Sequence, residues 1–254
     1  MTRFDGKVAF VTGSASGIGA EIVDQLVAEG CRVIGADLGD QAEISSRHGA
    51  SYLATTVDVT VESQIEDALA VGLEHFGRLD LAFNVAGAHR GGPITDMTRE
   101  SWDFTVDLVL TGVFLSTKHE ARTMRETGGA IVNIGSINGR VPMRGGAAYV
   151  SAKAGVEAFT KNAALELGQY GIRVNCVMPG LVETPLTQGY RSIAAVSEAF
   201  TDRIVLGRTA TVDEIAAPVL FLASDAASYI TGASLMVDGG WDVANYPDLR
   251  GLVD

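Results

Sequence analysis

Short apolar segments alternate along the chain with longer segments whose apolar residues recur at helical spacing. The short segments cover residues 7–12, 31–37, 52–59, 79–87, 130–136, 172–180 and 234–240, and the main helical ones cover 18–30, 62–77, 100–124 and 148–171. Several short segments are apolar at nearly every position, as in parallel strands covered on both faces. The pattern predicts an α/β fold, a Rossmann-like doubly wound parallel β-sheet of about seven strands with helices on both faces.

No linker, low-complexity run or internal repeat divides residues 1–254, so we expect a single domain. Ligands of such a sheet bind at the carboxyl ends of its strands. Ser136, Asp37, Asn84 and Pro179 all stand at or just after the end of a predicted strand. These residues are therefore candidates for a site.

Composition narrows the classes of function. A formal net charge of −12 argues against nucleic acid or an anionic membrane as the main partner, because phosphate binding needs a basic surface. Two cysteines make no disulfide framework, and the four histidines show none of the tight spacings of a metal site. No secretion signal or membrane-spanning apolar run is apparent. We expect a cytoplasmic protein without a bound metal.

The segment VTGSASGIG follows a predicted strand and opens a predicted helix, the context of a dinucleotide-binding turn. Glycines let the backbone approach a pyrophosphate, and amides at the helix N-terminus face its negative charge. The candidate contacts are Gly13, Ser16, Gly17, Ile18 and Gly19. A tight turn that binds nothing would also use a glycine, but the strand–loop–helix context favours the cofactor.

Asp37 ends the second predicted strand, 18 residues after Gly19. A carboxylate there can accept hydrogen bonds from an adenosine ribose and would repel a 2′-phosphate, which selects NAD over NADP. Asp58 and Val59 end the third strand, where a side-chain oxygen could contact the adenine. Both aspartates could instead be turn residues.

The segment AYVSAKAG places Tyr149 and Lys153 four residues apart in a chain with only four lysines. Residues at this spacing share one face of a helix. Taken alone, the pair could be an exposed pair on a helix surface or catalytic machinery.

Several ordered motifs together resemble the classical short-chain dehydrogenase/reductase family. The motifs are TGSASGIG, the NVAG block at 84–87, Ser136, the Tyr149–Lys153 pair, PGLVET at 179–184 and ITGASLMVDGG near the end. The resemblance implies that Tyr149 is the acid/base, that Lys153 lowers the tyrosine pKa and binds the nicotinamide ribose, and that Ser136 holds the substrate oxygen.

The resemblance implies further contacts to the cofactor. They come from Asn84, Ala86, Gly87, Pro179, Gly180, Val182 and Thr184, in addition to Tyr149 and Lys153 themselves. One position departs from the family, which usually carries an Asn where this chain has Val109. In the family that Asn shapes a helix kink where a water joins the proton relay, so we expect proton transfer to be weakened or rerouted.

The implied function is an oxidoreductase that transfers a hydride between NAD(H) and a secondary alcohol or ketone, with Tyr149 as acid/base. Alternatives are a 3-oxoacyl-thioester reductase, which would usually carry a basic residue near position 37, and a dinucleotide-binding regulator without turnover. The resemblance implies that residues 185–207 are the family's substrate lid, although a helix packed on the body of the protein would look the same. His89, Arg90 and Arg144 lie in loops that could contact substrate, although solvated loop residues would look the same.

Assembly is the last expectation. Val106, Leu110, Val113, Phe114 and Thr117 form an apolar stripe on the helix predicted at 100–124. Such a stripe could simply pack on the sheet, but the family pairs this helix with its copy. We therefore expect a homotetramer, with the tail 241–254 packed near a substrate pocket.

Overall fold

The strands form one seven-stranded parallel sheet in the order β3-β2-β1-β4-β5-β6-β7, which confirms the predicted doubly wound fold. The computed structural model describes residues 2–244. The strands are β1 Val8–Thr12, β2 Arg32–Asp37, β3 Tyr52–Thr56, β4 Leu81–Asn84, β5 Gly129–Ile134, β6 Ile172–Pro179 and β7 Ser234–Val237. The strand order reverses between β1 and β4, and a crevice is expected outside the carboxyl ends at that point.

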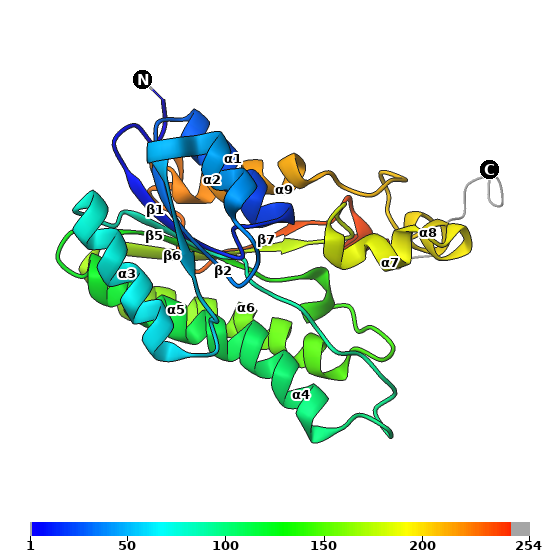
Figure 1. The fold of residues 1–254 in the computed structure, drawn as a ribbon. Helices are drawn as coiled ribbons and strands as arrows, with labels where there is room; N and C mark the ends of the chain where they lie inside the picture. Colours follow the sequence, from blue (N-terminus) through cyan, green and yellow to red (C-terminus); the bar gives the residue numbers. More distant parts are fainter. Residues whose placement is uncertain (1, 245–254) are drawn as a thin grey trace.

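Helices cover both faces of the sheet (Figure 1). They are α1 Gly17–Ala28, α2 Ala42–His48, α3 Glu62–Phe76, α4 Arg99–Val106, α5 Gly112–Met124, α6 Ala147–Leu167, α7 Gln188–Arg191, α8 Ala194–Thr201 and α9 Val212–Ala223. Helices α1, α2 and α9 lie on one face, and α3, α4, α5 and α6 on the other. No helix within residues 2–244 is long and apolar enough to cross a membrane.

Strand β1 shows why the central strands are apolar at every position. Ala9 and Val11 belong to the core under α1 and α9, whereas Val8 and Phe10 belong to the core on the opposite face. All four side chains are fully buried. Since neighbouring strand residues point to opposite faces, a sheet covered on both sides needs this unbroken run.

Residues 100–124, predicted as one helix, are divided. A π-helical segment, Asp107–Thr111, separates α4 from α5, and the Gly112 amide donates to the carbonyl of Asp107. A π-helix contains one more residue per hydrogen-bonded turn than an α-helix, and such segments are frequent at functional sites. The division therefore lies where the family resemblance implies a kink, although Val109 occupies the position.

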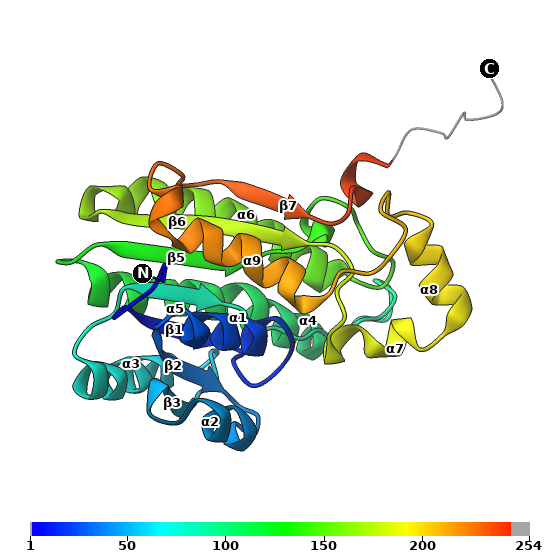
Figure 2. The same cartoon turned by 90° about the horizontal axis from the view of Figure 1, so that it is seen from above.

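The segment 185–207 lies beyond the carboxyl ends of the strands, where α7 and α8 are seen in Figure 2. A bridge between Val182 and Ala210 closes its base. After β7 the chain makes a short 3₁₀ turn, Trp241–Val243. The remainder of the predicted tail, residues 245–254, lies outside the described residues.

Candidate active site

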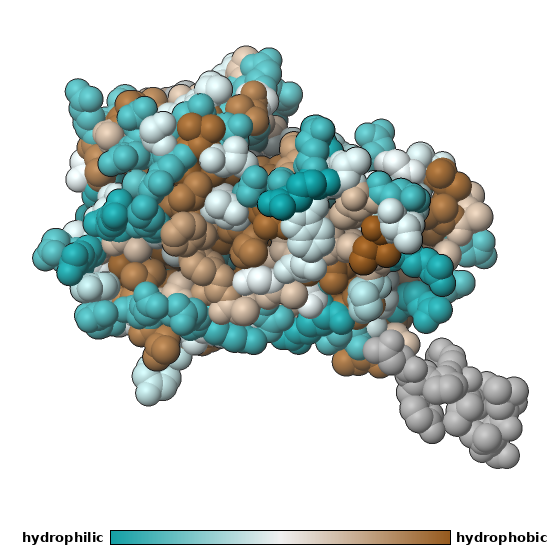
Figure 3. Space-filling view, turned by 90° about the horizontal axis from the view of Figure 1, so that it is seen from below, coloured by the Kyte–Doolittle hydropathy of each residue, from teal (hydrophilic) through white to brown (hydrophobic). Residues whose placement is uncertain are grey.

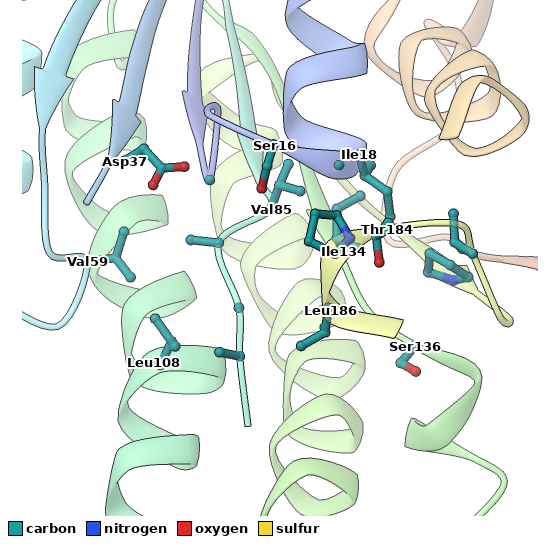
Figure 4. A pocket seen from close by; sticks show the side chains of 18 of the residues that line it. Ser16, Ile18, Asp37, Val59, Val85, Leu108, Ile134, Ser136, Thr184 and Leu186 are labelled. Atoms are coloured by element: carbon teal, nitrogen blue, oxygen red, sulfur yellow. The ribbon is translucent and has the colours of Figure 1, made fainter. Parts of the chain in front are cut away.

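A cleft of about 340 Å³ opens at the carboxyl ends of the strands. Its size lies within the range of small-molecule sites. The predicted residues that line it are Gly13, Ser16, Gly17, Ile18, Asp37, Asp58, Val59, Ala86, Gly87, Ser136, Tyr149, Lys153, Pro179, Gly180, Val182 and Thr184. Figure 4 shows Asp37 and Ser136 at opposite ends of this cleft. The fold therefore brings motifs from the whole length of the chain to one place.

Two predicted contacts, Gly19 and Asn84, are not part of the lining. A Cβ on Gly19 would collide with the carbonyl oxygen of Gly13, so this glycine allows close packing within the turn. Asn84 is buried, and its Nδ2 donates to Oδ1 of Asn133 at 2.9 Å and to Oε2 of Glu120 at 3.1 Å. In this structure both residues stand outside the cleft lining and take part in the packing of the residues around it.

The glycine turn leaves the N-terminus of α1 open to the cleft. Gly13 and Gly17 have φ of 70° and 56°, in the left-handed region that favours glycine. A Cβ on Gly13 would also lie 2.8 Å from the amide nitrogen of Ala86. Ser16 stands at the helix N-cap, yet no described side chain caps the first-turn amides. These amides are therefore free to bind an anion, and they fit a pyrophosphate.

Asp37 is held rigidly at one end of the cleft. Its Oδ2 accepts a hydrogen bond from the Ala15 amide at 2.9 Å, and its Oδ1 accepts one from the Gly39 amide at 2.7 Å. Each carboxylate oxygen keeps a further lone pair. The carboxylate therefore fits a ligand with hydroxyl groups and disfavours one that is negatively charged at this end.

Ser136, Tyr149 and Lys153 meet at the other end of the cleft. Ser136 follows β5, and its Oγ accepts a hydrogen bond from the Asn138 amide at 3.1 Å. Tyr149 and Lys153 lie one turn apart on α6, with the lysine Nζ 5.7 Å from the centre of the tyrosine ring. Nζ donates to the carbonyl oxygen of Ile134 at 2.6 Å. The arrangement joins a phenol, a hydroxyl and an amine within one site.

The ionisation of the Tyr149–Lys153 pair differs from the expectation. Burial raises the pKa of Tyr149, and a hydrogen bond with Ser136 lowers it by less. Burial also lowers the pKa of Lys153 to about 8. In this structure, which holds no cofactor, desolvation dominates both shifts, because a buried site disfavours both charged forms.

Residues that the sequence analysis missed also line the cleft. Leu38 directly follows Asp37, so adjacency to a predicted contact could have identified it. Leu108 belongs to the π-helical segment and Leu186 to the segment 185–207, and both are labelled in Figure 4. No motif marks these apolar positions, since they reach the cleft only through the tertiary fold.

The segment 185–207 contacts the turn after β7 through aromatic rings. Tyr190 and Phe200 have ring centres 6.0 Å apart, and Phe200 and Trp241 have centres 5.6 Å apart, both pairs edge to face. Aromatic pairs favour this geometry. The segment 185–207 and the turn after β7 are therefore packed together beside the cleft.

A second hollow lies between α5 and α6, on the face shown in Figure 3, where apolar side chains gather between charged ones. Phe114 and Phe159 pack edge to face within it, 6.1 Å apart. Phe114 is 45% exposed, whereas Val113 and Thr117 of the predicted stripe are buried. Part of the stripe therefore packs inward and part of it faces outward.

Comparisons with known proteins agree with this geometry. A family model described as "Enoyl-(Acyl carrier protein) reductase" matches residues 13–242. The trans-4-hydroxycyclohexanecarboxylate dehydrogenase of Sinomonas cyclohexanicum is 40% identical, covering 96% of this chain and 95% of the relative. The 2,5-dichloro-2,5-cyclohexadiene-1,4-diol dehydrogenase LinX of Sphingobium indicum is 38% identical, over 95% and 98%. The crystal structure of gox2181 superposes with a TM-score of 0.90 at 36% identity, over 95% and 97%.

Proposed function

Because the chain belongs to the classical short-chain dehydrogenase/reductase family, we propose that it transfers a hydride between NAD(H) and a secondary alcohol or ketone. The meeting of Ser136, Tyr149 and Lys153 in one cleft is the observation that carries the proposal. Membership of the family and the names of the relatives support oxidoreductase activity on secondary alcohols.

Each polar group at this end of the cleft has a role in proton transfer. As a phenolate, Tyr149 would take the alcohol proton during oxidation, and as a phenol it would donate that proton to the substrate oxygen during ketone reduction. Ser136 Oγ hydrogen-bonds the substrate oxygen and stabilises its charge. Lys153 Nζ holds the nicotinamide ribose and favours the phenolate when it is an ammonium. The nicotinamide itself supplies the hydride chemistry when bound.

NAD is the proposed cofactor because of Asp37. Its two oxygens are already oriented by backbone amides and can accept hydrogen bonds from the hydroxyls of the adenosine ribose. A 2′-phosphate in the same place would face a carboxylate, and like charges repel. The open N-terminus of α1 would hold the pyrophosphate. Asp58 and Val59 would lie beside the adenine.

The proposed substrates are secondary alcohols or ketones of moderate size, including cyclic ones. Support comes from the relatives, whose names give a hydroxycyclohexanecarboxylate and a cyclohexadienediol as substrates. Residues 185–207 would form the substrate lid, since Leu186 lines the cleft and the segment packs on Trp241. A 3-oxoacyl thioester remains an alternative substrate, and a non-catalytic binder remains the alternative class.

We also propose a cytoplasmic homotetramer. The exposed Phe114 of the stripe and the hollow beside α6 offer an apolar surface on which a second copy could pack. The tail 241–254 would lie near a substrate pocket. Trp241, the first residue of this tail, contacts Phe200 of the segment 185–207, which supports the proposed placement.

The proposal is tested by steady-state kinetics with NAD⁺ and NADP⁺ against a panel of alcohols and ketones. The panel contains cyclohexanol, cyclohexanone, 1,2-cyclohexanediol and a 3-oxoacyl thioester. Turnover of an alcohol or simple ketone with a preference for NAD(H) is expected. Turnover of the thioester alone would favour the acyl reductase, and cofactor binding without any turnover would favour the non-catalytic binder.

A further inference from the structure

His89 lies beside the acid/base tyrosine and does not line the cleft assigned to the cofactor. It stands two residues after Gly87, in the loop that follows β4. Its imidazole centre is 5.2 Å from the centre of the Tyr149 ring, with the two planes 45° apart. This contact places a polar ring against the side chain to which the proposed function gives the acid/base role.

The imidazole of His89 lacks hydrogen bonds where it is buried. Nδ1 is shielded from solvent and has no partner within residues 2–244. Burial is the one cause that lowers the pKa of His89, without a contribution from a charge or a hydrogen bond. The ring is therefore neutral near pH 7 and carries one donor and one acceptor nitrogen. Buried polar atoms are rarely left unpaired in native proteins, and those that are often have a functional reason.

The backbone that follows His89 is held at two points. The Arg90 amide donates to Oγ1 of Thr105 at 3.1 Å, and the Gly92 amide donates to the carbonyl of Gly145 at 2.8 Å. The second bond joins this loop to the one that precedes α6. The position of His89 relative to Tyr149 is therefore fixed by the fold.

The positive charge of Arg90, in the same loop, is directed toward α4. The Arg90 guanidinium donates to Oε1 of Glu100 at 3.0 Å and lies 4.1 Å from the centre of the Phe104 ring. Both partners belong to α4. The Arg90 guanidinium therefore already has partners, whereas Nδ1 of the neighbouring His89 has none within residues 2–244. An uncharged oxygen suits a neutral imidazole better than a carboxylate, which would require a cation.

We propose that His89 is a specificity residue that hydrogen-bonds a second, uncharged oxygen of the substrate, close to the carbon that reacts. This inference rests on the proposed function, in which Ser136 and Tyr149 hold the reacting oxygen. The imidazole contacts the Tyr149 ring. The second oxygen would therefore be carried by a carbon next to the one that reacts. The enzyme then prefers diols and hydroxy ketones to simple alcohols and ketones of the same skeleton.

The test compares kcat/KM for the cis and trans forms of 1,2-cyclohexanediol with kcat/KM for cyclohexanol, in the full-length protein. His89→Phe keeps a ring against Tyr149 and removes the hydrogen bond, and His89→Gln keeps a hydrogen-bonding group. His75→Phe, the same exchange at an exposed position of α3, is the matched control. The wild type should favour one diol by about tenfold or more, since a site built to bond a hydroxyl rejects the analogue without it.

His89→Phe should abolish that preference, His89→Gln should retain part of it, and His75→Phe should keep it in full. An unchanged diol-to-cyclohexanol ratio in His89→Phe would overturn the proposal. An equal loss on both substrates would also overturn it, because His89 would then act only by positioning Tyr149.

Failure of the proposed function is distinguishable from failure of this inference. If the wild type oxidises neither alcohol, NMR spectra of protein with ¹³C-labelled histidine and saturating NAD⁺ decide the matter, since they need no turnover. The His89 signal is the one that His89→Phe removes. A shift on addition of the diol but not of cyclohexanol supports the proposal, and the absence of a shift with the diol refutes it.

Discussion

Asn84 donates through Nδ2 to Oε2 of Glu120 across 3.1 Å, deep in the core between β4 and α5. The same amide also bonds Asn133 of β5. Burial raises the pKa of Glu120 to about 8, and the hydrogen bond from Asn84 lowers it by less. The carboxyl group is therefore neutral near pH 7, and the core contains an acid that the mechanism does not use.

Glu120→Gln should make stability less dependent on pH. The pKa of this carboxyl is raised in the folded state, so its contribution is complete below the unfolded value of about 4.5 and is lost as pH rises to about 8. One proton gives a slope of up to about 1.4 kcal/mol per pH unit. Glutamine does not titrate. The free energy of unfolding of the variant, measured by urea at pH 5 to 8, should gain on the wild type as pH rises.

Glu74→Gln, at an exposed position of α3, is the control for that measurement and should follow the wild type. A constant difference between Glu120→Gln and the wild type across the range would show that Glu120 keeps the same charge throughout.

Asp37 should give NAD(H) more than tenfold tighter binding than NADP(H), a difference above about 1.4 kcal/mol. Asp37→Ser removes the carboxylate and should reduce that preference. Asp40→Ser, three residues further along the same loop, should leave it unchanged. Fluorescence titration of both reduced cofactors measures the affinities. Equal affinities in the wild type would contradict the role of Asp37.

Tyr149→Phe should lower turnover by about 10²–10⁴ and leave NAD binding nearly intact, because it removes the proton donor and little cofactor contact. Steady-state kinetics and a cofactor titration separate the two effects. Near-wild-type turnover would mean that the proton comes from another group.

Lys153→Ala should damage both turnover and cofactor binding. In the wild type the pKa of Lys153 is about 8, so its ammonium is lost as pH rises through that value. Cofactor affinity should then fall above about pH 8 in the wild type and show no such step in Lys153→Ala. Titration of NADH from pH 6 to pH 9.5 tests this, and parallel profiles would argue against a role for the ammonium.

Val109→Asn restores the residue usual in the family, at a fully buried position of the π-helical segment. Turnover should rise or stay level if the proton path is otherwise ordinary. The kinetic measurement is paired with thermal unfolding, since an amide buried without partners destabilises. A large loss of turnover at unchanged stability would mean that this protein has reorganised its proton path.

Assembly should depend on the α5–α6 face and on the tail. Phe114→Glu places a charge in the hollow between the helices and should lower the mass seen by light scattering. Val71→Glu, at a similarly exposed apolar position of α3, is the matched control. Deletion of residues 242–254 should weaken assembly or change KM for substrate. A wild type that scatters as a monomer would refute the tetramer.

The fold followed from the sequence because its signals are local. All seven predicted strands exist, since runs such as Val8–Thr12 are apolar at every position and glycine turns punctuate them. Helix α9 was not predicted, although Thr211 and Glu214 form a capping box that marks its start. That capping box is a local signal from which the start of α9 can be predicted.

The candidate site residues could be predicted from ordered motifs. The contacts that these residues make depend on the tertiary fold and could not. Asn84 belongs to a recognisable motif, but only packing shows that it bonds Glu120 and stands outside the cleft lining. The pKa directions of Tyr149 and Lys153 depend on burial, which no spacing encodes. The contact of His89 with Tyr149 joins residues 60 positions apart, beyond the reach of a local pattern.

The π-helical segment Asp107–Thr111 sets the angular phase between α4 and α5. Each residue turns an α-helix by about 100°, so removal of the extra residue would rotate α5 by about that angle relative to α4. Leu115 and Met124, which pack into the core from α5, would then face away from it. Chain length in this segment is therefore constrained independently of composition. A single-residue deletion that a surface loop would tolerate should be disruptive here.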